Sequence, residues 1–578
     1  MQPMTNNVFR GKLAALAVFI LAGLAGSVRG EGLDAVLTEF RADQMDVEAT
    51  YDVPGSPAML DRRESLVGAW LKRLDGLDYD SLSPAARIDW HLLHTHLLAE
   101  REDFTLQRAR LSEMEPLIGF LHPLEDLLAD HSARQNLDAE QAASALAAAA
   151  DQLKDLRKRL GARPDAANAL KPSSVLALRT AETLERLRGD FNKWYGFYDG
   201  FQPDFSWWLK QPHTLLDKEL ETTATYLRKD IAGLKGEAED PLLGESIGRP
   251  ALEARLAEEM IPYSPEELIA IADKEFAWCE AEMKKAATAM GCKDGAEALA
   301  KIKSRHVPPG GQAALAQTEA SKAIRFVKDK GLVTIPPLAE ETWGVSMLSV
   351  SAQKTLPYAV YGRPNIGVAF ANEAMSHEEK EMAMRGNNSA FLHIVTPHEL
   401  IPGHHLQGFM ARRYATQRQM FSTPFLVEGW ALHWEMLLWD SNYTATPEEK
   451  VGALFWRMHR CARVIVSLKF HLGSMSPQQM IDFLVERVGH ERAGATSEVR
   501  RYIGDGYGPL YQAGYMVGGL QLRALYHDLT GSGKMSPREF HDRVLHEGPV
   551  SIEMIRAALT GAKLPKDWKP AWKFEERN

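Results

Sequence analysis

The chain has 578 residues, a formal net charge of −10, and 45% hydrophobic against 25% charged residues. These proportions are typical of a globular protein with a large core, and they exclude a disordered or low-complexity chain. An acidic chain without a long run of Lys or Arg also argues against nucleic acid as the main partner.

Residues 1–30 are predicted to be a signal peptide that is cleaved on export. Arg10 and Lys12 precede an uncharged apolar run over residues 13–26, and small residues follow it. The run is shorter than the about 20 apolar residues that a membrane-spanning helix needs. No cysteine lies near the cleavage zone to carry a lipid. We therefore expect a periplasmic or secreted protein with no stable membrane association after cleavage.

Residues 31–260 are predicted to form an N-terminal helical lobe, because apolar residues recur at spacings of three and four, as over residues 146–160. Residues 191–208 are rich in aromatic side chains. We interpret them as a helix–loop–helix packing element, with a cleft wall that contacts substrate as the alternative. Three histidines of one predicted helix are interpreted as helix surface or core rather than as a metal site: His91, His94 and His96.

Residues 261–578 are predicted to form the second, catalytic lobe. The string Tyr-Ser-Pro-Glu-Glu at residues 263–267 is typical of a helix start, with an N-cap serine, proline in the first helical position and a capping box. The chain then becomes rich in β-branched and aromatic residues, broken by Pro and Gly, before the helical pattern returns. This composition predicts a small sheet formed by residues 334–337, 345–350 and 358–370. The fold class that we expect is mainly α, with two lobes.

Three cysteines occur: Cys279, Cys292 and Cys461. They are too few for a disulfide scaffold and show no Cys-x-x-Cys spacing. We expect buried free thiols, and the sequence leaves open whether Cys279 pairs with Cys292.

Residues 396–407 are the most informative about function, because they contain His398-Glu399 and then Pro402-Gly403-His404-His405. This order is similar to the His-Glu-x-x-His helix of zinc peptidases, in which two imidazoles one turn apart bind Zn²⁺ and the Glu acts as a base. Here the fourth position after His398 is a proline, which cannot bind a metal. Pro402 would clash with the His398 carbonyl, and Gly403 permits unusual backbone angles, so we expect a kinked or bulged helix.

Two histidines compete for the second ligand position. In a regular helix His405 would share the face of His398, whereas a bulge favours His404. The third ligand is predicted to be Glu428, 24 positions after His404, in a Glu-Gly-Trp-Ala string that resembles the ligand string of several zinc peptidases. Gly429 is expected to let this helix approach the histidine helix closely. We predict a catalytic Zn²⁺ site with one open position; the alternative is a buried polar helix pair without metal.

The chain resembles the bacterial family called domain of unknown function 885. That family shows His-Glu-x-x-Pro-Gly-His-His-x-Gln, met here over residues 398–407, and Glu-Gly-Trp-Ala, met over residues 428–431, with Glu435 a further match. Residues 510–512 depart from a later family pattern, which is met in part at Arg501, Tyr502, Pro509, Tyr515 and Gly518. The resemblance spans nearly the whole mature chain.

That family is in turn similar to helical zinc peptidases of the thimet oligopeptidase, angiotensin-converting enzyme and carboxypeptidase Taq type. The resemblance implies a mainly α body with two lobes flanking a deep cleft. It also implies a short strand near the zinc helix that pairs with an extended peptide, for which residues 358–370 are the candidate. These zinc peptidases share the pattern His-Glu-x-Gly-His with a Glu about 24 residues further on, and this pattern favours His404 over His405.

The implied activity is zinc-dependent cleavage of short peptides, as a carboxypeptidase, dipeptidase or oligopeptidase. Glu399 would activate water and pass the proton to the leaving amine. Tyr515 is the first candidate for the donor to the oxyanion, and His471 is the second. The supporting candidates are Arg501 and Tyr511 for binding substrate, with a salt bridge from Arg501 to Glu498 as the alternative, and Glu435 for holding a ligand histidine.

Two other functions fit the same residues less well. One is a metal-dependent amidase that acts on a non-peptide substrate, and the other is a non-catalytic periplasmic binding protein with the same fold. The presence of His398, Glu399 and Glu428 argues against the second, because binding alone does not require a base beside the ligands. The sequence leaves peptide specificity, endo- or exo-action, the metal loaded and the oligomeric state open.

Overall fold

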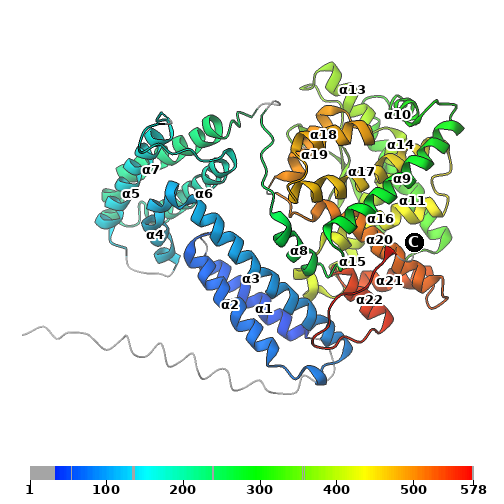
Figure 1. Cartoon of the computed structure of the whole chain (residues 1–578), viewed down its shortest axis with the longest axis horizontal. Coiled ribbons are helices and arrows are strands. Elements are labelled where there is room, and N and C mark those ends of the chain that lie inside the picture. Colours follow the sequence, from blue (N-terminus) through cyan, green and yellow to red (C-terminus); the bar gives the residue numbers. More distant parts are fainter. Residues whose placement is uncertain are drawn as a thin grey trace, which may run out of the picture.

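The structure is a computed structural model that describes residues 33–575, apart from residues 52, 54, 133–136, 164, 237–239, 355, 357 and 505. The predicted signal peptide therefore lies outside the described residues. The described chain is mainly helical, as expected, and it contains one three-stranded sheet (Figure 1). No helix in these ranges combines the length and the apolar character needed to cross a bilayer.

The first seven helices lie to one side of the molecule (Figure 1). Helices α1 to α3 share one hydrophobic core, and α4 to α7 share a second one with the end of α3. The long helix α3 thus joins the two groups. Serine N-caps followed by proline start α2 and α3, at Ser56 and Ser83. The bounds are α1 (Asp34–Thr50), α2 (Pro57–Asp75), α3 (Pro84–Ile118), α4 (His122–Ser132), α5 (Ala139–Leu160), α6 (Ser174–Tyr198) and α7 (Pro203–Tyr226), with short turns η1 (Tyr79–Ser81), η2 (Gly119–Leu121) and η3 (Leu227–Ile231).

The aromatic stretch at residues 191–208 forms the expected helix–loop–helix between α6 and α7. Trp194 and Phe205 are buried there with ring centroids 5.2 Å apart. Phe201 and Trp207 are 84% and 83% exposed, and the stretch contributes no residue to the cavity described below. The buried rings confirm the packing interpretation, and the exposed rings lie outside that cavity.

The remaining helices gather into one body with two large hydrophobic cores (Figure 1). Helix α9 begins with the predicted capping box at Ser264 and Glu267. Helix α17 is buried along most of its length, and α16 packs on α20. The bounds are α8 (Gly248–Glu258), α9 (Pro265–Ala289), α10 (Gly295–Lys303), α11 (Gln312–Lys330), α12 (Pro337–Thr342), α13 (His377–Gly386), α14 (Ser389–Glu399), α15 (His404–Ala411), α16 (Pro424–Asp440), α17 (Pro447–His471), α18 (Pro477–Phe483), α19 (Arg492–Ile503), α20 (Tyr511–Thr530), α21 (Pro537–His546) and α22 (Ile552–Thr560), with short turns η4 (Ala352–Lys354), η5 (Thr416–Phe421) and η6 (Leu484–Val488).

The sheet has the strand order β1-β3-β2, and β1 (Gly344–Met347) runs parallel to β3 (Asn365–Val368). Strand β2 (Val360–Gly362) pairs antiparallel with β3 and forms one edge. The prediction of strand structure at residues 334–337 is wrong. Proline has no N–H to donate to a ladder, and Pro337 instead begins helix α12.

Buried polar contacts tie α3 to the C-terminal body. Asp89 accepts a hydrogen bond from Nε of Arg418 at 2.8 Å, and both side chains are buried. His91 contacts the Tyr79 hydroxyl and the Pro565 carbonyl, and His94 stacks on Trp90, which confirms a packing role for both histidines.

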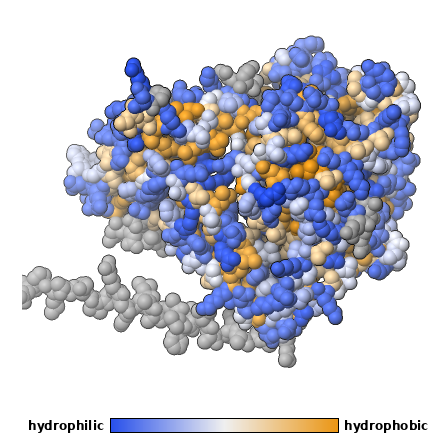
Figure 2. All heavy atoms as spheres, viewed as in Figure 1, coloured by the Kyte–Doolittle hydropathy of each residue, from blue (hydrophilic) through white to orange (hydrophobic). Residues whose placement is uncertain are grey.

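All three cysteines are buried and free, so Cys279 and Cys292 do not pair. Hydrophilic side chains cover most of the face seen in Figure 2, and hydrophobic residues reach this surface in patches. The large hydrophobic cores agree with the large core that the composition predicts.

Candidate metal centre and adjoining cavity

The helix that carries His398 breaks at the predicted place. Helix α14 ends at Glu399, and α15 begins at His404. A Cβ atom on residue 403 would overlap the carbonyl oxygen of His398, so only glycine fits at this turn. The N–H of Gly403 donates to the Pro397 carbonyl at 2.9 Å, and Nε1 of Trp430 donates to the Pro402 carbonyl at 2.9 Å. These two hydrogen bonds hold the turn.

The turn brings His404 beside His398. Ligand atoms of His398, Glu399 and His404 lie within 4.8 Å of one another, and the two imidazole rings are nearly perpendicular at 88°. Because successive helical residues point about 100° apart, His405 faces elsewhere. Its Nε2 lies 2.9 Å from the Ala339 carbonyl and its Nδ1 lies 3.4 Å from the Tyr361 hydroxyl. The structure therefore places His404 at the site and His405 outside it.

Glu428, in the second turn of α16, faces both imidazoles. Its Oε2 lies 3.2 Å from Nε2 of His404 and 3.8 Å from Nε2 of His398. Its Oε1 accepts a hydrogen bond from the Tyr511 hydroxyl. Oε2 itself is buried and accepts no hydrogen bond from the described part of the chain, which is costly for a carboxylate oxygen unless a cation joins it.

Gly429 does permit a close approach, although not to the histidine helix. A Cβ atom there would lie 2.6 Å from the Gly518 carbonyl carbon, so α16 packs backbone to backbone on α20. The prediction that Gly429 brings this helix close to the histidine helix is therefore wrong. The close packing of α16 on α20 places Tyr511, at the start of α20, against Glu428.

Two carboxylates lie near the imidazoles, and their surroundings differ. Oε2 of Glu399 already accepts a hydrogen bond from the Tyr361 N–H at 2.8 Å, whereas Oε2 of Glu428 accepts none. In a tetrahedral zinc site with bonds of about 2.0–2.2 Å, ligand atoms lie about 3.3–3.5 Å apart. The separations from Glu428 are close to this value. Two histidines and one carboxylate are also a donor set of catalytic zinc sites, so His398, His404 and Glu428 fit the metal, which leaves Glu399 beside it.

The electrostatics of these groups are tightly coupled. Burial alone would raise the pKa of Glu428, but His404 and His398 outweigh it and hold that pKa well below its ordinary value. Burial would lower the pKa of His398, but the neighbouring carboxylates of Glu428 and Glu435 outweigh burial and raise that pKa to about 9. The carboxylates thus attract positive charge to this point, a proton in the metal-free protein or a divalent cation in its place.

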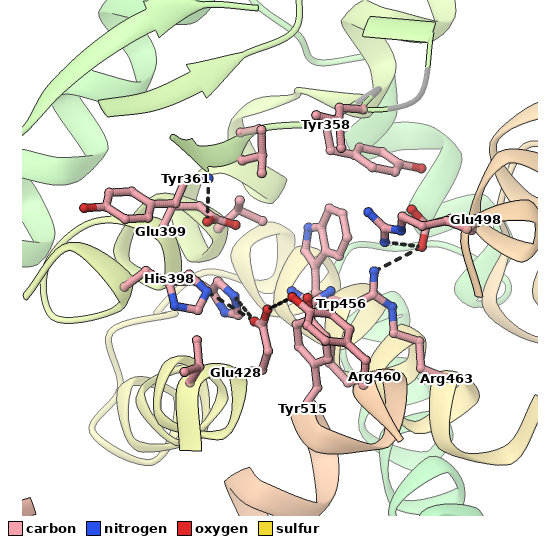
Figure 3. Close-up of a pocket in the computed structure, with 18 of the residues that line it drawn as sticks. Tyr358, Tyr361, His398, Glu399, Glu428, Trp456, Arg460, Arg463, Glu498 and Tyr515 are labelled. Atoms are coloured by element: carbon pink, nitrogen blue, oxygen red, sulfur yellow. Dashed lines mark hydrogen bonds and ion pairs between the residues drawn. The ribbon is translucent and has the colours of Figure 1, made fainter. Parts of the chain in front are cut away.

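These groups line one end of a cavity of about 350 Å³ (Figure 3). Residues of β2, including Tyr361, form one wall, and Trp456 and Tyr515 lie between the two ends. The ring of Tyr515 is stacked with that of His398 at 6.3 Å. The other lining residues include Tyr358, Val395, Val427, Arg460, Arg463, Glu498, Arg501, Tyr507 and Tyr511.

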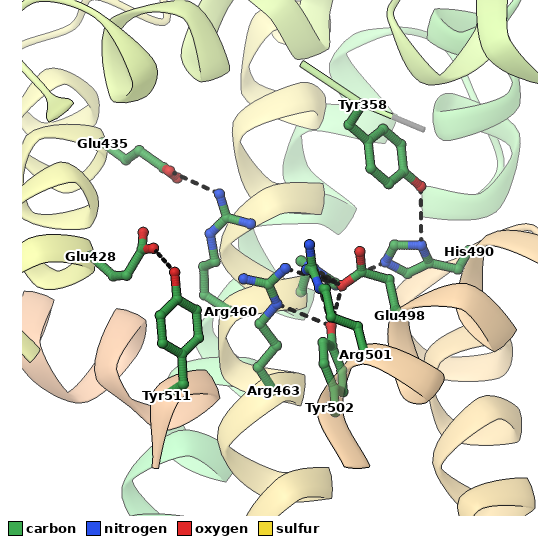
Figure 4. Close-up of polar contacts among 11 residues, drawn as sticks. Tyr358, Glu428, Glu435, Arg460, Arg463, His490, Glu498, Arg501, Tyr502 and Tyr511 are labelled. Atoms are coloured by element: carbon green, nitrogen blue, oxygen red, sulfur yellow. Dashed lines mark hydrogen bonds and ion pairs between the residues drawn. The ribbon is translucent and has the colours of Figure 1, made fainter. Parts of the chain in front are cut away.

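The far end of the cavity is built from arginines and one buried glutamate (Figure 4). Oε2 of Glu498 accepts hydrogen bonds from Nη2 of Arg463 at 3.0 Å and from Nη2 of Arg501 at 2.9 Å. It also accepts one from the Tyr502 hydroxyl at 2.6 Å. Burial would raise the pKa of Glu498, but Arg501 and Arg463 hold it well below its usual range.

The structure brings most of the predicted site residues together, and His471 is an exception. Tyr515 and Tyr511 line the cavity, and Oε1 of Glu435 lies 2.6 Å from Nδ1 of His398. Arg501 lines the cavity, and it also makes the salt bridge to Glu498 that was the alternative. His471 is the last residue of α17, about two turns beyond Arg463, and it does not line the cavity.

Sequence reasoning missed Arg460, Arg463 and the Tyr361 N–H. The two arginines are three positions apart in an otherwise largely apolar stretch of α17, a spacing that places both on one face of a helix. That spacing was a usable signal, because arginines in a buried helix need a polar partner. The role of the Tyr361 N–H depends on where the sheet lies, and no local pattern reports it.

Comparisons with known proteins show the same fold in other bacterial proteins. Two solved structures each align with 92% of this chain: "a putative lipoprotein of unknown function from Shewanella oneidensis", at 18% identity and a TM-score of 0.67 over 100% of that chain, and "the putative lipoprotein from Colwellia psychrerythraea", at 17% identity and 0.58 over 98%. At these identities the likeness shows the fold alone. None of the curated proteins matches significantly. The profile described as "Bacterial protein of unknown function (DUF885)" matches residues 44–559, most of the chain, and the protein therefore belongs to that family.

Proposed function

We propose that this protein is an exported zinc-dependent hydrolase that cleaves peptide bonds of short peptides, with Glu399 as the general base. One observation carries the proposal. Oε2 of Glu428 is buried without a hydrogen bond from any described residue, and it faces Nε2 of His404 at 3.2 Å and Nε2 of His398 at 3.8 Å. Three converging donors with one unsatisfied oxygen have the form of a catalytic metal site.

The chain's own residues have distinct tasks in this proposal. A bound zinc ion would polarise the peptide carbonyl and make a water molecule more acidic. Glu399 removes the proton from the attacking water and passes it to the leaving amine, and the Tyr361 N–H holds this carboxylate in position. Glu435 accepts a hydrogen bond from Nδ1 of His398, so that Nε2 of the same ring is free to bind metal.

Two tyrosines support the reaction from the cavity wall. Tyr515 is the proposed donor to the oxygen that becomes negative, because its ring lies beside that of His398 in the cavity. Tyr511 donates to Oε1 of Glu428 and so orients the ligand rather than the substrate. The edge strand β2 lines the cavity through Val360 and Tyr361, and Ala359 just before it does so too; we propose that β2 pairs with the substrate backbone.

Export is the cellular part of the proposal. The charged start, apolar run and small residues within residues 1–30 have the order of a signal peptide. The two similar structures are described as those of "putative" lipoproteins, a class of exported protein. A hydrolase of short peptides in the periplasm is consistent with both observations.

The substitution Glu399→Gln tests the assignment. The amide oxygen of glutamine can still accept the Tyr361 N–H, so the fold and zinc content should be unchanged, while peptide hydrolysis falls about 10²–10⁴-fold. Glu378→Gln on the exposed start of α13 is the matched control and should keep full activity. Activity is measured on a peptide library and on small non-peptide amides. Full activity of Glu399→Gln, or turnover of the amides alone, would overturn the proposal.

A further inference from the structure

Three arginines line the cavity beyond the histidines. Arg460 is the nearest of them, because one oxygen of Glu435 lies 3.4 Å from Nη2 of Arg460 and 2.6 Å from Nδ1 of His398. Arg460 and Arg463 come from α17, and Arg501 comes from α19. In Figure 4 the guanidinium groups of Arg463 and Arg501 gather at Glu498, and that of Arg460 points to Glu435. The side chains of Arg460 and Arg463 are each 5% exposed, and that of Arg501 is 24% exposed. Arg501 therefore lies nearest to solvent.

These arginines have more donors than the surrounding residues satisfy. Nε of Arg460, Nη1 of Arg463 and Nε of Arg501 are buried and donate no hydrogen bond within the described residues. Buried guanidinium N–H groups are normally paired, because each unpaired donor loses its hydration without compensation. Three such donors on residues that line one cavity indicate a missing acceptor.

The charges around these arginines do not balance either. Glu498 is shared by Arg463 and Arg501, and Glu435 is shared by Arg460 and His398. Three guanidinium groups therefore face two carboxylates, and each carboxylate also lies beside an imidazole: Glu435 is 2.6 Å from His398 and Glu498 is 3.5 Å from His459. A buried positive charge without a partner is strongly unfavourable, so an anion that enters the cavity gains both charge and hydrogen bonds here.

We propose that this arginine cluster, Arg460, Arg463 and Arg501, binds the free C-terminal carboxylate of the substrate, so that the protein cleaves peptides close to their C-terminus. The inference rests on the proposed function and specifies its substrate class. A planar carboxylate matches the two parallel N–H groups of a guanidinium. The cavity of about 350 Å³ lies at the small end of the range of ligand pockets, roughly 300–1,000 Å³, which leaves room for only a short stretch of peptide between the histidines and the arginines.

Within the cluster, Arg463 carries most of the argument. Its Nε donates to the Tyr502 hydroxyl at 3.0 Å and its Nη2 donates to Glu498, which fixes the guanidinium and leaves Nη1 for a ligand. Its guanidinium also lies 4.4 Å from the ring centroid of Tyr515, the proposed donor at the reacting carbonyl. The residue expected from sequence, Arg501, holds Glu498 in place and lies nearer to solvent.

The test compares three forms of one short peptide. The first has a free C-terminal carboxylate and the second has a C-terminal amide. The third also has a C-terminal amide, but its last residue is glutamate, so its only carboxylate near that end is on a side chain. Binding is measured by calorimetry on the zinc-loaded Glu399→Gln variant, which does not consume the peptide, and cleavage products are measured with the wild type. We expect the free acid to bind at least tenfold more tightly than either amide, and cleavage to fall near its C-terminus.

The variants Arg463→Lys and Arg463→Gln should reduce the ratio between acid and amide toward one, mainly through KM. Arg487→Lys, in a surface pair with Glu280, is the matched control and should leave the ratio unchanged. Thermal unfolding and zinc content establish that each variant is folded, and the wild-type comparison decides the question if Arg463 variants do not fold.

Equal binding of acid and amide, or binding of neither, would overturn the inference even if peptides are hydrolysed. Equally tight binding of the glutamate amide would assign the cluster to an acidic side chain and overturn the C-terminal assignment. A clear preference for the acid without any hydrolysis would support the carboxylate site and reject the proposed peptidase activity, so the two failures are distinguishable.

Discussion

Oε1 of Glu435 lies 2.6 Å from Nδ1 of His398, and the same oxygen lies 3.4 Å from Nη2 of Arg460. One carboxylate therefore contacts both the candidate metal centre and the arginine cluster. Burial would raise the pKa of Glu435, but Arg460 and His398 hold it below its ordinary value, so the group is a carboxylate at neutral pH. This contact fixes the ring of His398 and links the two ends of the cavity.

The substitution Glu435→Gln should weaken zinc binding while the site keeps its shape. A neutral amide still accepts from Nδ1 of His398 but no longer makes the imidazole a stronger ligand, so we expect the zinc dissociation constant to rise about 10–100-fold. Competition with a coloured chelator measures the constant. Glu486→Gln, an exposed glutamate, is the control. An unchanged constant in Glu435→Gln would remove Glu435 from its supporting role.

Two Gly→Ala substitutions, one at a helix contact and one on an exposed helix face, test the packing that positions Glu428. Gly429→Ala would put a Cβ atom 2.6 Å from the Gly518 carbonyl carbon, which forces α16 and α20 apart and should cost about 1–3 kcal/mol of unfolding free energy. Gly68→Ala lies on an exposed face of α2 with no atom within 4 Å, and it should instead stabilise by about 0.4–1 kcal/mol. Thermal unfolding measures both. Similar midpoints for the two variants would contradict this packing.

The local sequence predicts much of the metal end of the site. His398, Glu399 and the break at Pro402 and Gly403 are close in sequence, and the clash of a proline ring with a helix is a local property. The choice between His404 and His405 needed either the resemblance to zinc peptidases or the structure, because helical geometry alone favoured His405.

The arginine end and the sheet edge could not be predicted in the same way. Arg463 meets Glu498 only because α17 and α19 pack together, and no spacing in the chain reports that contact. His471 was expected from a resemblance, but it is the last residue of α17 and does not line the cavity. Local motifs thus predicted the site residues that lie close together in sequence. The positions of the other site residues depend on tertiary packing.

A buried pair of histidines should make stability depend on pH. Nε2 of His541 lies 3.0 Å from Nε2 of His433, and its Nδ1 lies 2.8 Å from the Leu332 carbonyl. Burial lowers the pKa of His541 to about 4, below the about 6.5 of an unfolded chain. The unfolded state therefore binds more protons between these values, so the stability contributed by neutral His541 is complete above pH 6.5 and is lost as the pH falls toward 4.

Urea unfolding of the metal-free protein at pH 7.5, 6 and 5 measures this dependence. In His541→Gln the slope of unfolding free energy against pH below 6.5 should be shallower by up to about 1.4 kcal/mol per pH unit, because one of the two groups no longer titrates. The comparison is made between slopes, so a loss of stability from the substitution itself does not affect it. Identical slopes would show that His541 is not held neutral by burial.

The zinc content of two neighbouring variants tests the central claim most directly. His404→Ala removes an imidazole whose Nε2 faces Glu428, whereas His405→Ala removes one that contacts the Ala339 carbonyl and the Tyr361 hydroxyl. After dialysis against excess zinc and then buffer, mass spectrometry should find about one zinc ion per chain in the wild type and in His405→Ala, and almost none in folded His404→Ala. Equal zinc in wild type and His404→Ala, or no zinc in the wild type, would contradict the account.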